Sequence, residues 1–259
     1  MEENVVSSDA VADFLANRPY ERRVVVFYDI LGWRNHIEKA GKQLEKIGEL
    51  RRLVLLHSRM LRLPTPVPVN VSTFSDNVVI SLKPSKAVTS LLLAMATIVL
   101  STATRGFYIR GGIAVGDIIH DDEVVFGPGL NRAYEIESKI AKFPRIIVDQ
   151  EVLAECGPIT GFSSYEDGIH FLDPFNADFV QFVLDARTDI VKPDIRNVGV
   201  SPPNDSLKGV SGTGLLKEIL GSLKREIKSP LSDREWEKMA WLYDRVASRL
   251  GAPPARRAE

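Results

Sequence analysis

The stretch VVVFYDILGW, from Val24 to Trp33, constrains the fold of this chain more than any other. Its first five residues are apolar without alternation, and a strand of that kind is usually central in a sheet and covered on both faces. One carboxylate, Asp29, follows this run. A second apolar stretch, STFSDNVVIS, also carries a single carboxylate, Asp76, among good turn residues. Each of the two most strand-like runs therefore brings one acid to its end.

The order of the expected elements indicates a ferredoxin-like sheet. Strands are expected over residues 24–28, 67–74, 78–82, 107–115 and 123–126, and helices over 33–40, 44–61, 87–104 and 130–141. The short strands RIIVD, GIHFLDP and DFVQFVL should follow. The order strand, helix, strand, strand, helix, strand predicts an α+β fold with a βαββαβ core, in which the helices pack on one face of an antiparallel-mixed sheet.

The two ends of the chain add helices to this core. We expect a helix over residues 8–18 within an N-terminal segment 1–22, a folded domain over 23–187, a loop containing several Pro and Gly over 188–213, and two helices over 214–259. The last helix begins with a capping box from Ser232 to Glu235. Its apolar stripe should pack on the domain or on a second copy, and comprises Trp236, Met239, Ala240, Tyr243, Val246, Ala247 and Leu250.

The composition argues against several classes of protein. A formal net charge of -1 gives no overall basic field for nucleic acid, although this total does not exclude a local basic patch. Cys156 is the single cysteine, so no internal disulfide can form, and the N-terminus MEENVVSSDA shows no signal pattern; we expect a cytoplasmic protein. Residues 87–104 carry no charge, which favours a helix buried against the sheet over a membrane span. The histidines show no metal-ligand spacing.

Asp29 and Asp76 are expected to meet at one edge of the sheet, because the first strand of a ferredoxin-like sheet lies beside the hairpin that holds Asp76. Two unpaired carboxylates at close range repel, and a divalent cation relieves the repulsion. Mg²⁺ and Mn²⁺ bind through one or two carboxylates together with substrate phosphates, and backbone N–H groups near Gly32 suit phosphate oxygens. This layout is typical of two-metal phosphoryl transfer. In the plainer alternative, Asp29 caps a helix and Asp76 is an ordinary turn acid.

Three motifs in sequence order resemble those of the class III nucleotidyl cyclases. FYDILGW is similar to their first metal motif, with Trp33 in place of Phe, and FSDN supplies their second metal aspartate, Asp76. The steps GIAVG, Gly112–Gly116, and GPGLN, Gly127–Asn131, resemble their later strand and dimerisation arm. The similarity covers roughly Arg23 to Asp149. It implies the class III cyclase fold for the central domain.

Three departures separate this chain from the purine cyclases of that family. Ser72 stands where they read the base with Lys, Val124 stands where adenylate cyclases use Asp, and Glu135 stands where the family has its transition-state Arg. The chain most resembles the pyrimidine cyclases of the bacterial Pycsar anti-phage systems. That resemblance implies conversion of UTP or CTP, with UTP favoured, to the 3′,5′-cyclic monophosphate and pyrophosphate. It further implies a homodimer with shared active sites and a separate effector protein that senses the product.

The resemblance also gives roles to single residues. Asp29, Asp76 and the Ile30 carbonyl would hold two Mg²⁺ or Mn²⁺ ions. Asn131 would orient the ribose, and Arg110 would reach the phosphates. The expected substrate-binding residues, among which Trp33 or Tyr28 would wall a pocket for a one-ring base, are Tyr28, Ile30, Leu31, Gly32, Trp33, Ser72, Val124 and Arg132.

Several alternatives stay open at this point. Arg132, Arg110 or Lys139 would supply the cation that Glu135 does not, or else the chain is a catalytically inactive cyclase-like domain that binds a nucleotide and signals by conformation. A palm-type polymerase or dinucleotide cyclase shares the strand order and the paired acids, but its Gly-Gly-Asp/Glu-Glu-Phe turn is absent from the sequence. A structural interaction protein would need neither aspartate.

Overall fold

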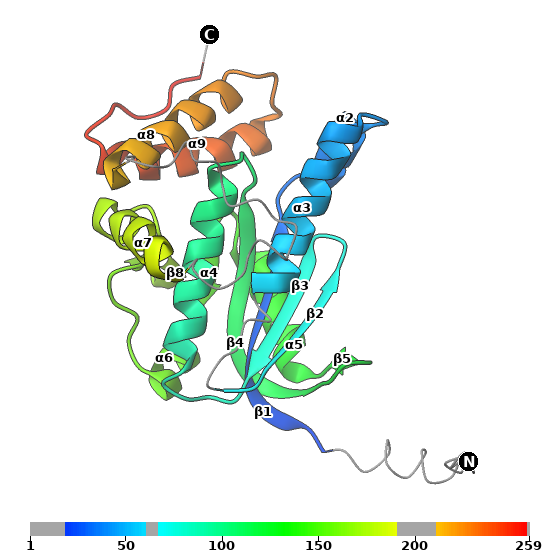
Figure 1. Ribbon diagram of the computed structural model, residues 1–259. Coiled ribbons are helices and arrows are strands. Elements are labelled where there is room, and N and C mark those ends of the chain that lie inside the picture. Colours follow the sequence, from blue (N-terminus) through cyan, green and yellow to red (C-terminus); the bar gives the residue numbers. More distant parts are fainter. Residues whose placement is uncertain (1–18, 61–66, 191–210, 258–259) are drawn as a thin grey trace.

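The computed structural model describes residues 19–60, 67–190 and 211–257. Within these ranges one mixed sheet has the strand order β2-β3-β1-β4-β6-β8-β7, with β5 paired to β4 (Figure 1). Its strands are β1 (Glu21–Ile30), β2 (Val69–Phe74), β3 (Asn77–Leu82), β4 (Ile109–His120), β5 (Val125–Phe126), β6 (Ile146–Val148), β7 (Ser163–Glu166) and β8 (Ile169–Leu172). The helix expected over residues 8–18 and most of the loop expected over 188–213 lie outside the described residues.

β1 is the central strand of this sheet. It pairs antiparallel with β3 on one side and with β4 on the other. Val24, Val26 and Tyr28 belong to the main hydrophobic core, whereas Val25 belongs to a second core on the opposite face. Both faces of β1 are therefore covered, which explains why its sequence is apolar without alternation.

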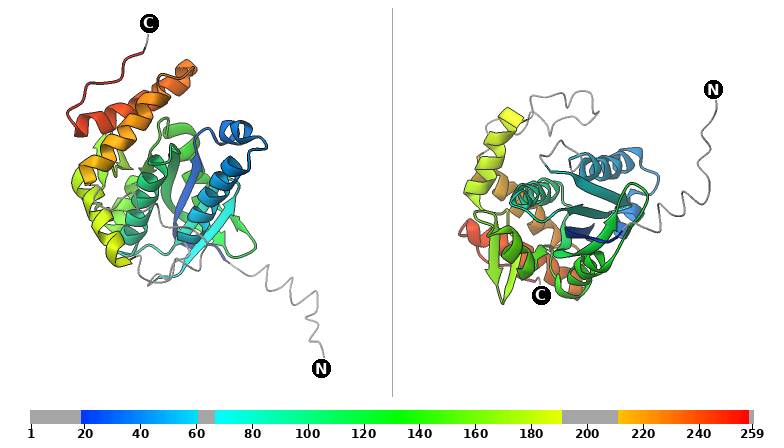
Figure 2. Two further views of the ribbon diagram at one scale, coloured as in Figure 1. Left: turned by 45° about the horizontal axis from the view of Figure 1, so that its top comes forward. Right: turned by 90° about the horizontal axis from the view of Figure 1, so that it is seen from below.

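Helices cover both faces of the sheet (Figures 1 and 2). α3 (Leu44–Met60) and α4 (Val88–Ala103) lie on one face, as expected for the helices of the βαββαβ core. α5 (Pro128–Glu135) continues into a π-helix, η1 (Ile136–Ile140), on the other face. The predicted α+β fold, a single sheet with packed helices, is confirmed.

Glycines on β4 allow α5 to approach the sheet closely. A Cβ at Gly112 would lie 2.4 Å from the carbonyl oxygen of Ala133, and a Cβ at Gly116 would lie 2.6 Å from the Cα of Gly129. Real Cβ atoms do not come so near to backbone atoms, so only glycine fits at these positions without a shift of the helix. The two glycine steps that resemble the cyclase motifs thus have a packing role in this chain.

Two parts of the fold differ from the sequence prediction. Residues 178–184, expected as a strand, belong to helix α7 (Ala177–Ile190). Phe179, Val180 and Val183 are buried there, and their spacing of three and four residues suits one helical face. A short apolar run does not distinguish the two states by its periodicity. Helix α6 (Gln150–Cys156) and strand β7 were not predicted at all.

The C-terminal helices α8 (Gly212–Glu226) and α9 (Asp233–Arg249) pack on the domain. The predicted capping box at Ser232 is present, with both of its hydrogen bonds. Met239, Tyr243 and Val246 of α9 join the main hydrophobic core. Arg245 also forms an ion pair with Asp173, at 3.0 Å, and the Asp173 side chain is only 1% exposed. The apolar stripe of α9 is therefore turned toward this chain's own domain.

The uncharged helix α4 is buried in the main core along most of its length. Among the described residues, no helix has both the length and the apolar character that crossing a bilayer would require. Burial against the sheet accounts for the lack of charge in this segment.

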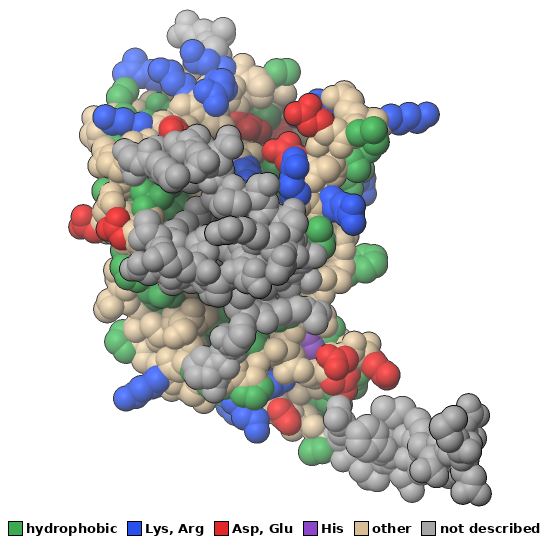
Figure 3. Space-filling model, viewed as in Figure 1, with side chains coloured by type: hydrophobic (Ala, Val, Ile, Leu, Met, Phe, Trp, Pro, Cys, Tyr) green, Lys and Arg blue, Asp and Glu red, His purple; other side chains and the backbone are tan. Residues whose placement is uncertain are grey.

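The surface carries a local concentration of positive charge despite the net charge of -1. Lys and Arg side chains gather at the top of the view in Figure 3, over the C-terminal helices. The exposed cations of α8, its following turn and the C-terminal segment are Lys217, Lys224, Arg225, Lys228, Arg256 and Arg257. This end of the molecule is therefore basic although the net charge of the whole chain is close to zero.

Candidate active site

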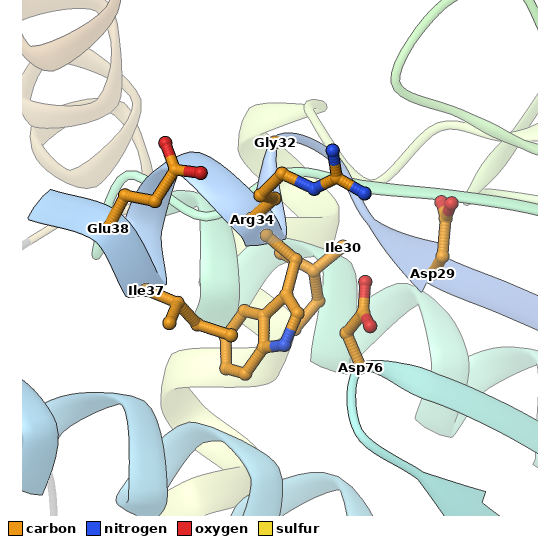
Figure 4. Close-up of a pocket in the computed structure, with 8 residues that line it drawn as sticks. Asp29, Ile30, Gly32, Arg34, Ile37, Glu38 and Asp76 are labelled. Atoms are coloured by element: carbon orange, nitrogen blue, oxygen red, sulfur yellow. The ribbon is translucent and has the colours of Figure 1, made fainter. Parts of the chain in front are cut away.

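A cavity of about 730 Å³ opens where β1 ends, beside the turn between β2 and β3 (Figure 4). The residues that line it are Asp29, Ile30, Gly32, Trp33, Arg34, Ile37, Glu38 and Asp76. The structure therefore brings together both predicted metal-binding aspartates and three of the predicted substrate-binding residues. Arg34, Ile37 and Glu38 were not predicted, because their contribution depends on the direction in which the following helix leaves the strand.

The strand register explains why the two aspartates meet. β1 and β3 pair antiparallel from Val24 and Leu82 to Tyr28 and Val78, so β1 ends and β3 begins at the same edge of the sheet. Asp29 comes next on β1, and Asp76 precedes β3 in the turn of the hairpin. The two carboxylates reach one cavity from elements that are far apart in sequence.

Trp33 fixes the hairpin turn against the start of α2 (Trp33–Ala40). Its indole Nε1 donates a hydrogen bond to Oγ of Ser75 at 2.9 Å. Ser75 has a φ of 57°, a left-handed conformation that non-glycine residues adopt rarely. The turn that carries Asp76 is thus held in a specific shape beside the helix.

Gly32 makes the sharp change of direction from β1 into α2. Its φ of 72° and ψ of 18° are left-handed, and it occupies the N-cap of α2 without any side-chain cap. The first N–H groups of a helix have no partner within the helix and attract anions. Because Gly32 and Trp33 line the cavity, this helix start faces the two aspartates.

Burial and mutual repulsion act on Asp76. Partial burial raises the pKa of its carboxyl, and the charge of nearby Asp29 adds to this effect. Hydrogen bonds to the backbone of Asp76, the side chain of Ser75 and the backbone of Ile30 oppose it. The ionised form of Asp76 is therefore disfavoured, and a nearby cation would stabilise it.

Asp29 belongs to a partly buried charge cluster that was not predicted from the sequence. Its Oδ2 lies 3.0 Å from Nη2 of Arg110, its partner in the β1–β4 register. Arg110 also pairs with Glu137, which is buried on η1. Burial, followed by repulsion from Asp29, raises the pKa of Glu137 to about 7, while Arg110 opposes the shift. Glu137 lies on the π-helical turn η1 with its side chain only 3% exposed.

Two predicted substrate-binding residues lie in the interior instead. Tyr28 is fully buried in the main core, since it alternates with Asp29 along β1 and so faces the other side of the sheet. Tyr28 therefore does not line the cavity, contrary to the prediction. Trp33, the alternative residue, does line it. Leu31 packs against the main core and donates its backbone N–H to the Tyr108 carbonyl at 2.8 Å.

The other predicted residues lie away from this cavity. Ser72 hydrogen-bonds Nε2 of His120 at 3.1 Å, and Val124 is 44% exposed just before β5. Asn131 and Arg132 are exposed on the first turns of α5. Arg132 is paired there with Asp149 at 2.9 Å. None of the four lines the cavity that holds the two aspartates.

The donors in the cavity suit a hard divalent cation. Asp29 and Asp76 offer carboxylate oxygens, the ligand type that Mg²⁺ and Mn²⁺ prefer, and Ile30 lines the same cavity. Within the described ranges, no group of three or more His, Cys, Asp or Glu side chains is arranged to hold a metal. Such an ion would therefore need oxygens from a bound phosphate or from water to complete its coordination, as Mg²⁺ commonly does.

Comparison with solved structures finds nucleotide cyclases. One is an adenylate/guanylate cyclase/hydrolase from Silicibacter pomeroyi, with 15% identity, a TM-score of 0.41 and coverage of 60% of this chain and 98% of that chain. Another is a monomeric guanylyl cyclase domain from the aquatic fungus Blastocladiella emersonii, with 18% identity, a TM-score of 0.46 and coverage of 60% and 95%. A third is the catalytic core of a rhodopsin-guanylyl cyclase with converted specificity, in complex with ATPαS, with 16% identity, a TM-score of 0.46 and coverage of 60% and 97%. No family model matches the sequence, and no curated protein matches it.

Proposed function

We propose that this chain is a nucleotidyl cyclase of the class III type, which converts a nucleoside triphosphate to a 3′,5′-cyclic monophosphate and pyrophosphate. The observation that carries the proposal is the convergence of Asp29 and Asp76 on one cavity beside the uncapped start of α2. Paired carboxylates and free helix N–H groups together suit a metal-bound triphosphate. A structural interaction protein would need neither feature.

In this proposal, different residues of the cavity bind the metal ions and the phosphates. Asp29, Asp76 and the Ile30 carbonyl would hold two Mg²⁺ or Mn²⁺ ions, and the N–H groups at the start of α2 would bind phosphate oxygens. When bound, the ions lower the pKa of the ribose 3′-hydroxyl and neutralise charge on the triphosphate. The 3′-oxygen attacks the α-phosphorus in line, its proton passes to water, and the bond to pyrophosphate breaks. The protein's main contribution is to position the reacting groups.

We propose a pyrimidine substrate, UTP before CTP. Ser72 and Val124 occupy the two positions at which the resembling purine cyclases read their base, and neither offers the Lys or Asp found there. Ser72 is instead engaged with His120. Trp33 lines the cavity, and a ring of that size would favour a base with one ring.

The proposal includes a homodimer with shared active sites. Val124, Asn131 and Arg132 lie away from the cavity of their own chain, so they contribute to a site only if a second copy presents them. Exposed apolar residues near them, Phe126 and Tyr134, provide contact surface for such a copy. We further propose that the cyclic product acts in the cytoplasm on a separate effector in anti-phage signalling.

One observation favours a second candidate, a catalytically inactive cyclase-like domain that binds a nucleotide. Glu135 stands at the family's transition-state Arg position and pairs with Lys139 at 2.9 Å and with Arg132 at 3.5 Å. Two of the cations that would replace that Arg are thereby occupied with an acid. In this candidate the cavity binds a triphosphate without turnover.

Product analysis tests the proposal and separates the candidates. The purified protein is incubated with each of the four ribonucleoside triphosphates and Mn²⁺, and the products are identified by mass. Cyclic UMP or cyclic CMP with equimolar pyrophosphate is the expected result. Turnover of ATP or GTP alone would remove the pyrimidine assignment. Tight nucleotide binding with all four substrates intact would support the inactive domain.

A further inference from the structure

The three cations that the sequence suggested for the substrate are each paired with an acid. Arg110 is held between Asp29 and Glu137. Arg132 is paired with Asp149, and Lys139 is paired with Glu135. The cations suggested by the sequence are therefore already neutralised by acids of this chain.

Arg34 differs from these residues in place and in pairing. It lines the cavity together with Asp29 and Asp76, and within the part of the chain that the structure describes it forms no ion pair. Figure 4 shows its guanidinium directed toward the side of the cavity where the two carboxylates lie. Glu38, one turn later on the same helix, points away from it.

The position of Arg34 within α2 gives a second reason to expect that it binds an anion. It lies in the first turn, where the helix dipole is positive and a cation is unfavourable, and no acid in that turn compensates for it. Guanidinium charge and unpaired N–H groups are thus concentrated at one wall of the cavity. Such an arrangement is costly in the free protein but suits a ligand with several negative charges.

We infer that Arg34 binds the terminal phosphates of the nucleoside triphosphate and, after cyclisation, the pyrophosphate product. This inference rests on the proposed function and assigns a residue to its polyphosphate. The planar guanidinium offers two parallel N–H donors to phosphate oxygens, a geometry that lysine does not reproduce. Arg34 thus supplies a cation that neither Glu135 nor its paired neighbours offer.

Calorimetric titration with inorganic pyrophosphate and Mg²⁺ tests the inference without requiring turnover. The proteins are the wild type, Arg34→Ala, Arg34→Lys and the control Lys42→Ala, which removes an exposed cation from the turn after α2, outside the cavity. Arg34→Ala should raise the dissociation constant about 10- to 100-fold, the range expected for charge-assisted hydrogen bonds. Arg34→Lys should fall between Arg34→Ala and the wild type, and Lys42→Ala should match the wild type.

The outcomes separate this inference from the proposed function. Equal affinity of Arg34→Ala and the wild type would overturn the role of Arg34 and leave the cyclase proposal standing. If Arg34→Ala and Lys42→Ala weakened pyrophosphate binding equally, the effect would come from the net charge of the protein. That result would also overturn the inference. Absence of pyrophosphate binding to the wild type would count against both. Arg34 is exposed, so its removal leaves the core intact, which a thermal melt of each variant verifies.

Discussion

Asp29 and Asp76 share one cavity but have different surroundings. Asp29 has a fixed counter-charge in Arg110, whereas the described residues form no ion pair with Asp76. The pKa of Asp76 is accordingly raised, first by burial and then by repulsion from Asp29. A divalent cation should therefore stabilise ionised Asp76 more than ionised Asp29. Removing the charge of Asp76 should also destabilise the fold less than removing the charge of Asp29.

Asp76→Asn should separate function from stability. In EDTA at pH 7, the substitution should raise the free energy of unfolding by about 0.5 kcal/mol, because it removes a partly buried charge next to a like charge. The same variant should lose metal-dependent turnover. Urea unfolding measures the first effect, with Asp122→Asn, an exposed acid outside the cavity, as the control. Clear destabilisation by Asp76→Asn would show that this acid has a structural role.

His120 should make stability depend on pH. Its Nδ1 lies 2.8 Å from Oγ of Ser81, and burial followed by the charge of Arg23 lowers its pKa to about 4. The folded protein therefore favours neutral His120. This contribution is complete above about pH 6.5, the ordinary value, and is lost as the pH falls toward 4, up to about 3 kcal/mol in all.

Urea unfolding between pH 7 and pH 4 measures this effect. The decline in free energy of unfolding should be shallower in His120→Gln than in the wild type. His170→Gln, a histidine of β8 outside the Ser72–Ser81 network, should keep the wild-type slope. Parallel curves for all three proteins would contradict the assignment.

At the scale of elements, the contact between α5 and β4 depends on glycine. A Cβ at Gly112 would meet both the Ala133 carbonyl and the Ile136 side chain. Because η1 follows α5 and carries Glu137, a shift of α5 would also displace the acid that pairs with Arg110. Packing behind the sheet and charge arrangement at the cavity are thus linked through one helix.

Gly112→Ala should destabilise the protein by about 2 kcal/mol or more, since overpacking a close contact forces the backbone to move. The control is Gly48→Ala within α3, where an added Cβ meets no atom within 4 Å. That variant should be neutral or stabilising by about 0.5–1 kcal/mol, because alanine favours helix. Chemical denaturation distinguishes the two. Equal effects would mean that α5 moves freely on β4.

Elements with a strong local signal were predictable from the sequence, and those without one were not. β1 was marked by its unbroken apolar run, and the capping box of α9 by Ser232 and Glu235. The strand expected at 178–184 is helical because a short apolar run fits both periods. β7 was missed although Asp167-Gly168, with φ values of 51° and 78°, is a good hairpin turn.

The candidate site follows the same division. Asp29 and Asp76 were predictable because strand order alone carries them to one sheet edge. Arg34 and Glu137 were not, since one depends on the direction of α2 after a left-handed glycine and the other on a π-helical turn. Both are set by backbone details that leave no periodic trace in the sequence.

At the scale of the whole molecule, the arm beyond β4 stands out because it leaves apolar side chains uncovered. Val124 is 44% exposed, Phe126 48% and Tyr134 54%. Exposed large apolar side chains that gather in one patch often mark an interface. The C-terminal helices do not cover it, because α9 turns its apolar face toward the main core.

Phe126→Glu should convert a dimer of the wild-type chain to a monomer and reduce turnover with it, since the proposed sites are shared. Sedimentation equilibrium reports the mass, with Tyr165→Glu as the control, an exposed aromatic residue on β7 at 58% exposure. The control should stay dimeric. A wild-type chain that is monomeric while catalytically active would rule out shared sites.

Binding of Mn²⁺ in the presence of 3′-deoxy-UTP, which lacks the attacking hydroxyl, is the most direct test of whether Asp29 and Asp76 hold divalent ions. Electron paramagnetic resonance counts the bound ions. The wild type should bind Mn²⁺ and nucleotide together, and Asp29→Asn and Asp76→Asn should each weaken Mn²⁺ binding by at least about 10-fold while keeping the fold. Wild-type affinity for Mn²⁺ in both variants would contradict the assignment of these two acids and, with it, the proposed cyclase.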